Sequence, residues 1–222
     1  MPCAGGPGAG VELWLLLAGA AAAIGGALAI AIGWHAVGHR RVVQALRRTS
    51  RPSLLLGHEV VLVSGLQAPA VAGLARPRIY CPPDLADRLN ERELGAVLLH
   101  ERCHQLAHDP ARLVVLAALV SILPHSDRVR RTVEGRIAGI EIAADRHALR
   151  AGARRADIAA ALLKLGSAAH APGFAGYASA TELRLRHLVG GEAPEASRRS
   201  ALLWLLAPVV AFMGCGLLSL IG

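Results

Sequence analysis

One long apolar run restricts the folds open to this chain more than any other feature. Val11 to Trp34, VELWLLLAGAAAAIGGALAIAIGW, carries a single charged side chain, Glu12, at its outer end. A helix of this length spans about 36 Å at about 1.5 Å per residue, which is enough to cross a hydrocarbon core of about 30 Å. The run lacks the preceding basic residues of a signal peptide and is longer than a signal peptide's apolar region. We therefore expect a retained transmembrane helix.

A second apolar run closes the sequence. Ala201 to Gly222 contains no charged residue, so we expect a second, C-terminal transmembrane helix. The chain as a whole is 54% hydrophobic but only 3% aromatic, with a mean hydropathy of +0.43. A soluble domain of this size rarely has that composition. The sequence predicts a short N-terminal segment (1–10), a span (11–34), one domain (35–200) and a final span (201–222).

The arginines predict the orientation in the membrane. HRRVVQALRRTSR (39–51) follows the first span, two arginines precede the second, and the two outer ends carry no basic side chain. The positive-inside rule then places both termini outside the plasma membrane and the intervening domain in the cytoplasm. The formal net charge of +8 gathers largely at these membrane borders. It therefore favours contact with the lipid bilayer, and we expect no nucleic-acid binding.

The intervening domain contains strand and helix signals. EVVLVS (59–64) and PRIYC (77–81) are typical of short strands, which could pair as a hairpin or a small sheet. A helix is expected from Glu91 to His108, with Asn90 as its N-cap and Glu93 completing a capping box. Further helices are expected at 126–149 and 153–165, and a short basic helix starts after Thr181.

The helix that follows Asp109-Pro110 is the ambiguous element. Asp109 is expected to cap it, and Pro110 suits its first turn. Its apolar centre, Leu113 to Leu123, is about 16 Å long, roughly half a bilayer. It could be re-entrant, interfacial or simply a buried core helix, and we favour membrane contact. The expected fold class is a mainly α membrane protein in which transmembrane helices flank a helical domain with a small sheet.

A metal-binding pattern lies on the 91–108 helix. In HERCH, His100 and His104 are four residues apart and so share one helix face, where two imidazoles could bind one Zn²⁺. Glu101 is turned by about 100° from His100, which suits a base that takes a proton from a water activated by zinc. The pattern is short, and the alternative is an ordinary solvated helix face with two histidines.

The downstream helix offers a third ligand. Glu141 opens EIAAD, and Asp145 lies one turn later on the same face. A glutamate from a second helix could complete the zinc site, while Asp145 could accept a hydrogen bond from a ligand histidine and fix its tautomer. Glu134, two turns earlier, is the rival third ligand. We favour Glu141.

These motifs together resemble the membrane zinc metallopeptidases of the BlaR/MecR antirepressor type and, more distantly, the HtpX and Ste-type proteases. HERCHQLAHD, EIAAD and the stretch APAVAGLARPRIYCPPDLADRLNERELGAVLLHE carry the resemblance, which covers about residues 69–149. It implies His100, His104 and Glu141 as zinc ligands and Glu101 as the catalytic base. It also implies supporting roles for Asp145 and for Asp109, which matches an aspartate that family members carry after the HExxH motif.

The resemblance implies a membrane-embedded zinc metalloendopeptidase whose metallopeptidase domain (35–200) faces the cytoplasm. Its partner would be a protein or peptide substrate, such as a transcriptional repressor or a membrane protein. Typical members have more N-terminal spans, and some carry an extracellular β-lactam-binding domain after the last span. This sequence, which ends at Gly222, predicts neither. The alternative from another class is a non-catalytic membrane interaction protein that keeps the metallopeptidase fold.

Overall fold

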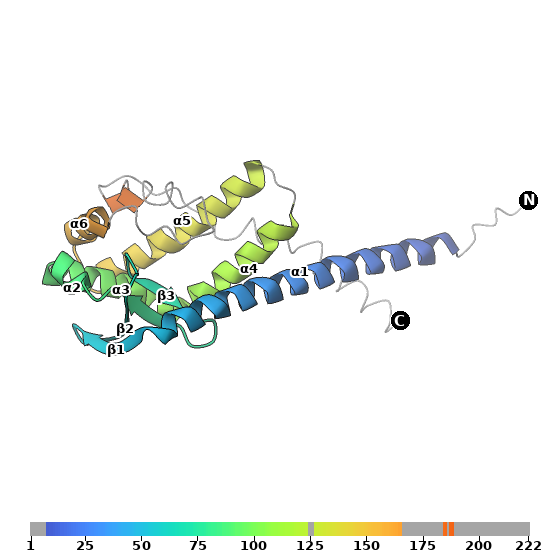
Figure 1. Cartoon of the computed structure of the whole chain (residues 1–222). Coiled ribbons are helices and arrows are strands. Elements are labelled where there is room, and N and C mark those ends of the chain that lie inside the picture. Colours follow the sequence, from blue (N-terminus) through green and yellow to red (C-terminus); the bar gives the residue numbers. More distant parts are fainter. Residues whose placement is uncertain (1–7, 124–126, 166–183, 186, 189–222) are drawn as a thin grey trace, which may run out of the picture.

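The computed structural model describes residues 8–123, 127–165, 184–185 and 187–188 (Figure 1). The elements follow in the order α1 (Gly8–Arg48), β1 (Ser50–Leu55), β2 (His58–Val63), β3 (Ala70–Ala72), β4 (Arg78–Cys81), α2 (Leu85–Arg88), α3 (Glu91–Ala107), α4 (Asp109–Ile122), α5 (Asp127–Arg150) and α6 (Arg155–Leu165). The mainly α fold with a short sheet, expected from the sequence, is confirmed. The expected second span (201–222) lies outside the described residues, as does the linker before it.

Helix α1 extends away from the rest of the molecule (Figure 1). Its stretch Trp14–Arg48 has a mean hydropathy of 2.3 in its most apolar window, none of which is buried against other elements. Large apolar side chains such as Leu16 and Trp34 are 70% and 80% exposed, as the side chains of a lipid-facing helix would be. The helix does not end with the apolar run at Trp34 but continues to Arg48, because no proline interrupts residues 35–48.

The sheet has the strand order β1-β2-β4-β3. Strands β1 and β2 form an antiparallel hairpin whose turn, Leu56-Gly57, has positive φ at both residues, as a type I′ hairpin turn requires. The two strands expected from the sequence, β2 and β4, do pair, but they run parallel because β3 lies between them in sequence. Strand β1 was not expected, and its Pro52 is tolerated because β1 lies at a sheet edge.

Two apolar clusters join the sheet to the helices. On one side, Leu98 of α3, which is fully buried, packs with Ile79 of β4 and Leu165 of α6. On the other side, Val43 of α1 packs with Tyr80 of β4. The C-terminal part of α1 is therefore part of the domain core, and the sheet is held between α1 and α3.

Helix α3 begins and ends at well-defined signals. The predicted capping box is confirmed: Asn90 accepts hydrogen bonds from the backbone of Arg92 and Glu93, and Glu93 accepts one from the backbone of Asn90. At the other end His108 adopts the left-handed conformation, with φ of 53°. The chain bends there by 64°, so α4 leaves the axis of α3 and packs along α1.

One local expectation at this bend is wrong. The N-cap position of α4 belongs to His108, and no side chain caps the helix. Asp109 is instead the first helical residue, with Pro110 beside it in the first turn as expected. Its buried carboxylate points back toward α3, where His104 donates to Oδ2, while Arg112, one turn later on α4, donates to Oδ1.

Candidate metal centre

Helix α3 presents two histidines side by side, as four-residue spacing requires. The ring centroids of His100 and His104 are 4.7 Å apart, and their Nε2 atoms are 3.0 Å apart. Both side chains are nearly buried, with 7% and 11% of their surface exposed. The two rings therefore direct the same nitrogen at one small region.

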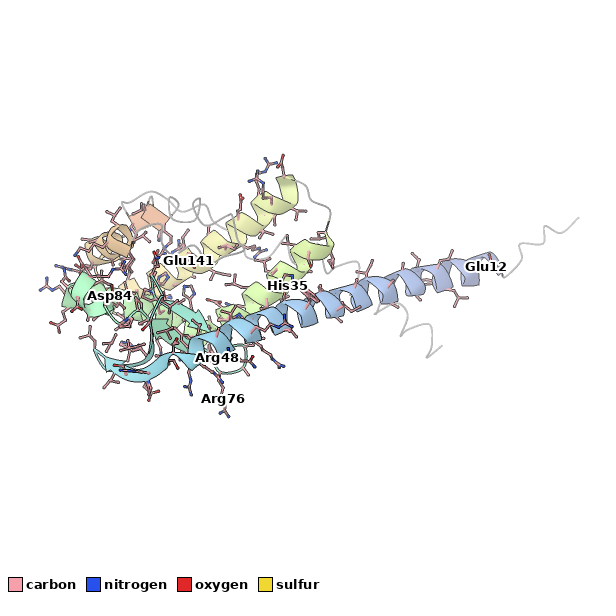
Figure 2. The ribbon with its side chains drawn as sticks, in the orientation of Figure 1. Glu12, His35, Arg48, Arg76, Asp84 and Glu141 are labelled. Carbon is pink, nitrogen blue, oxygen red and sulfur yellow. The ribbon has the colours of Figure 1, made fainter. Side chains whose placement is uncertain are left out.

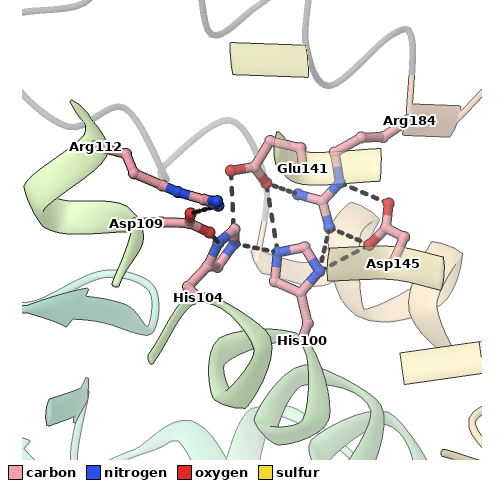
Figure 3. A network of polar contacts seen from close by, with 7 residues as sticks. All are labelled: His100, His104, Asp109, Arg112, Glu141, Asp145 and Arg184. Atoms are coloured by element: carbon pink, nitrogen blue, oxygen red, sulfur yellow. Dashed lines mark hydrogen bonds and ion pairs between the residues drawn. The ribbon is translucent and has the colours of Figure 1, made fainter. Parts of the chain in front are cut away.

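Helix α5 brings a carboxylate to the same region. Glu141 places Oε2 at 3.4 Å from Nε2 of His100 and Oε1 at 3.6 Å from Nε2 of His104 (Figure 3). Helices α3 and α5 can pack closely because small side chains lie between α5 and its neighbours, such as Ala144 and Ala148, which are 1% and 0% exposed. One ligand atom from each of the three residues lies within 4.8 Å of the others.

The far side of each imidazole is held by an aspartate. Nδ1 of His100 lies 2.8 Å from Oδ1 of Asp145, and Nδ1 of His104 lies 2.8 Å from Oδ2 of Asp109. A carboxylate accepts hydrogen bonds, so each Nδ1 carries the proton and donates it. In the neutral rings, each Nε2 then keeps a lone pair.

This donor set fits a metal ion. Two Nε2 lone pairs and one carboxylate face each other with no proton between them in the neutral tautomers, an arrangement that is repulsive unless a cation lies among them. Ligands about 2.0–2.1 Å from a tetrahedral zinc lie about 3.3 Å from one another. The 3.0, 3.4 and 3.6 Å separations found here are close to that value. Two histidines and one carboxylate also leave a fourth position for water or substrate.

Without a metal, protons must supply the missing positive charge. Burial and the charge of Arg184 lower the pKa of His100, but hydrogen bonds to Asp145 and Glu141 outweigh them and raise that pKa to about 9. Burial raises the pKa of Glu141, but the hydrogen bond and charge of His100 and the charges of His104 and Arg184 lower it to about 2. The side chains of His100, His104 and Glu141 together therefore favour a positive charge at their centre.

Arg184 is the part of the site that sequence reasoning missed. Its guanidinium donates from Nε to Oδ2 of Asp145 at 3.0 Å, from Nη2 to Oδ1 of Asp145 at 2.8 Å and from Nη1 to Oε2 of Glu141 at 3.1 Å (Figure 3). Its side chain is only 14% exposed. The sequence showed Arg184 as one of two arginines in a short basic helix. No spacing rule connects it to Glu141 and Asp145, which precede it by 43 and 39 residues.

Glu101 lies on α3 beside the first histidine and is 9% exposed. Within the described part of the chain its carboxylate forms no hydrogen bond or close ion pair. Its charge reaches Cys81 on β4, where burial first and Glu101 second raise the pKa of the thiol to about 12. Cys81 is therefore a neutral thiol and a poor metal ligand.

Glu134, the rival for the third ligand, is occupied elsewhere. It lies two turns before Glu141 on α5, about 10 Å along the helix. Its Oε1 accepts a hydrogen bond from Arg130 at 3.0 Å. It does not belong to the group of converging ligand atoms found among the described residues.

Comparison with known protein families identifies the family of this chain. The family model described as BlaR1 peptidase M56 matches residues 13–187, from the apolar part of α1 to the residues just beyond Arg184. The match confirms the resemblance expected from residues 69–149 and extends it in both directions. No curated protein matches the chain.

Proposed function

The chain belongs to the BlaR1 peptidase M56 family, and from that premise we propose that it is a membrane-anchored zinc metalloendopeptidase. The observation that carries this proposal is the convergence of His100, His104 and Glu141, whose ligand atoms lie within 4.8 Å of one another. Zinc suits two imidazoles and a carboxylate better than magnesium or calcium, which prefer oxygen ligands alone. Zinc, when bound, would polarise the scissile carbonyl and make water a stronger acid.

The protein's own groups would then perform the proton transfers. Glu101 would take a proton from the attacking water and pass it to the leaving amine. Glu101 as a whole is 9% exposed, and its carboxylate has no hydrogen-bond partner among the described residues to compete for the proton. Asp145 and Asp109 would hold the imidazoles of His100 and His104 in the tautomer that leaves Nε2 free.

The sheet edge suggests how a substrate would be held. Strand β3 is an outer strand of the sheet and contacts α3 and α4. An extended peptide could add to it as a further strand, because an edge strand has unpaired backbone N–H and C=O groups. This would place a flexible segment of a protein, rather than a folded domain, beside the metal ligands. Methylation of single backbone amides along a cleaved peptide would test this. The cleavage rate should decrease when every second amide is methylated, because only alternate N–H groups of an added strand face β3.

The membrane arrangement is part of the proposal. Helix α1 would cross the bilayer, and the sheet and the metal centre, which lie at its arginine-rich C-terminal end, would face the cytoplasm. The expected second span would return the C-terminus to the outside. Cysteine labelling at the N-terminus and in the 190–197 linker tests this, because the two sites should be accessible from opposite sides of the membrane.

The natural substrate would be a cytoplasmic repressor or a membrane protein. The competing function is a non-catalytic interaction protein that keeps the fold and the metal. Both functions predict zinc in the purified protein, so metal content alone does not separate them. A change at the proposed base, Glu101, does separate the two functions, because an interaction protein does not need a proton acceptor at that position.

The decisive experiment is Glu101→Gln in the purified full chain, reconstituted in lipid. Zinc content and cleavage of the protein itself and of an unstructured test protein would both be measured. We expect loss of cleavage with unchanged zinc content. Glu91→Gln, in the first turn of the same helix and exposed, is the matched control and should cleave as the wild type does. Equal cleavage by Glu101→Gln and the wild type would refute the assigned role of Glu101.

A further inference from the structure

A second pocket lies away from the metal centre, between the C-terminal part of α1 and the loop before β4. Its volume is about 330 Å³, at the lower end of the range for small-molecule sites. Helix α1 and the loop contribute the lining residues His39, Arg40, Val43, Gln44, Arg47, Gly73, Leu74, Ala75 and Arg76. The pocket is thus formed by tertiary contact rather than by a run of basic residues alone.

The loop is fixed in place by its glycine. Gly73 has φ of +113°, and a Cβ added there would lie 2.7 Å from the carbonyl oxygen of Arg76. Only glycine therefore allows this turn. The backbone N–H of Gly73 donates to Nε2 of His39 at 3.0 Å, which attaches the loop to α1. Arg76 is thereby held opposite the arginines of the helix.

Three arginines surround the pocket without any carboxylate in its lining. Arg40 and Arg47 lie on the same face of α1, two turns apart, and Arg76 comes from the loop. All three are exposed, and none has an ion pair within the described part of the chain. Like charges around one small volume repel each other, so an anion between them would be stabilising.

The position of the pocket along α1 indicates which kind of anion would lie near it. Arg40 lies about 9 Å along the helix beyond Trp34, the last residue of the apolar run, at the depth of the lipid headgroups if α1 crosses a bilayer. Figure 2 labels Arg48 at the C-terminal end of α1 and Arg76 on the loop below it. Guanidinium groups match phosphate oxygens in pairs, and juxtamembrane arginines attract anionic lipids.

We infer that this pocket binds a phosphate group, and that the phosphate is the headgroup of an anionic phospholipid. Arg40, Arg47 and Arg76 contact the phosphate oxygens. The wall formed by Val43, Leu74 and Ala75 contacts the carbon atoms of the phospholipid's glycerol backbone. This site is independent of the metal centre, although it requires that α1 be inserted in a membrane.

The test compares two triple variants with the same change in net charge. Arg40→Gln, Arg47→Gln and Arg76→Gln remove the pocket arginines. Arg41→Gln, Arg48→Gln and Arg78→Gln remove three neighbours that do not line the pocket. Binding of phosphatidylglycerol, phosphatidylcholine and inorganic phosphate to the detergent-purified full chain would be measured by native mass spectrometry. Circular dichroism and zinc content confirm that both variants are folded.

The wild type should retain one phosphatidylglycerol in preference to phosphatidylcholine. The pocket variant should bind phosphatidylglycerol more than about tenfold more weakly, since each arginine near a lipid surface contributes about fivefold. The control variant should change by less than about threefold, because it loses only screened long-range attraction. Inorganic phosphate that binds as tightly as the lipid would identify a free phosphate as the ligand of the same site. Equal weakening in the two variants, or no bound anion in the wild type, would overturn the proposal.

Discussion

Arg184 and Asp145 form a two-point ion pair in which Nε and Nη2 of the guanidinium donate to the two carboxylate oxygens, at 3.0 and 2.8 Å. Asp145 is fully buried, and the oxygen that accepts from Nη2 also accepts from Nδ1 of His100. The third donor of the guanidinium, Nη1, reaches Glu141. Arg184 therefore neutralises part of the charge of Glu141, the same carboxylate that a metal ion at His100, His104 and Glu141 would neutralise.

The first prediction is that Arg184 and zinc oppose each other. Removing one partner of a buried ion pair costs about 3–5 kcal/mol, so Arg184→Gln should strongly lower the melting temperature of the metal-free protein. Zinc supplies part of the missing charge, so the loss should be smaller in the zinc-loaded protein. Scanning calorimetry or dye-based melting with and without zinc measures both. The stabilisation that zinc gives should therefore be larger in Arg184→Gln than in the wild type.

Arg184→Lys and Arg146→Gln complete this experiment. Lysine restores the charge but not the paired geometry, so its response to zinc should be intermediate. Arg146 is exposed on α5, so Arg146→Gln is the control: it removes the same charge as Arg184→Gln but at a distance from the carboxylates. If zinc stabilises Arg184→Gln and the wild type equally, Arg184 has only a packing role.

A second prediction concerns Asp145, which contacts the ligand histidine His100 rather than the metal itself. Asp145→Asn keeps the size of the side chain but loses the charge that holds His100 in its tautomer. Zinc retention and cleavage should each fall by about 10–100-fold. The protein should still fold, at a lower melting temperature, because Arg184 loses its charged partner. Glu141→Gln should be worse, because a ligand atom is weakened directly. Zinc competition with a chelator measures the effect, and wild-type retention in Asp145→Asn would contradict the assigned role.

A third prediction uses the face of α3 that is turned away from the metal. Leu98 is fully buried against Ile79 and Leu165, so Leu98→Ala should lower the free energy of unfolding by about 2–5 kcal/mol. Zinc per folded molecule should stay unchanged, because the histidines lie on another face. Leu106→Ala, on the same helix but 57% exposed, is the control and should change stability little. Denaturant unfolding in detergent compares them.

Local signals explain why much of the helical framework could be predicted from the sequence. The capping box at Asn90 and Glu93 fixes the start of α3 through contacts three residues apart. The spacing of four residues in HERCH and EIAAD determines which side chains share a helix face. An apolar residue on this helix is not buried by that fact alone, since Leu106 of α3 is exposed.

Tertiary contacts decide the features that the sequence left hidden. Asp109 could equally cap α4 or turn back to His104, and the bend at His108 selects the second. The parallel pairing of β2 with β4 depends on the path of the intervening chain. Arg184 reaches the site from beyond a stretch of about forty residues, a separation at which no periodicity operates.

The fourth prediction concerns acid stability at the start of α3. Lys164 on α6 donates to Oε2 of Glu93 at 2.6 Å, and the same oxygen accepts from the backbone of Asn90. The hydrogen bond from Lys164 first, and that from Asn90 second, lower the pKa of Glu93 below its ordinary value of 4.5. A lowered carboxyl pKa stabilises the folded state fully above the unfolded pKa, and this stability is lost as the pH falls through the folded pKa.

Glu93→Gln should therefore be less stable than the wild type at pH 7, and the difference should shrink as the pH falls below about 4.5. Lys164→Gln should give the same convergence, because it removes the other half of the pair. Melting temperatures between pH 3 and pH 7 would be compared as differences from the wild type, so that acid effects elsewhere in the protein cancel. Glu91→Gln removes an exposed carboxylate from the same first turn and should show a much smaller pH dependence. A difference between Glu93→Gln and the wild type that stays constant over this range would mean that Glu93 acts only through its neutral hydrogen bonds.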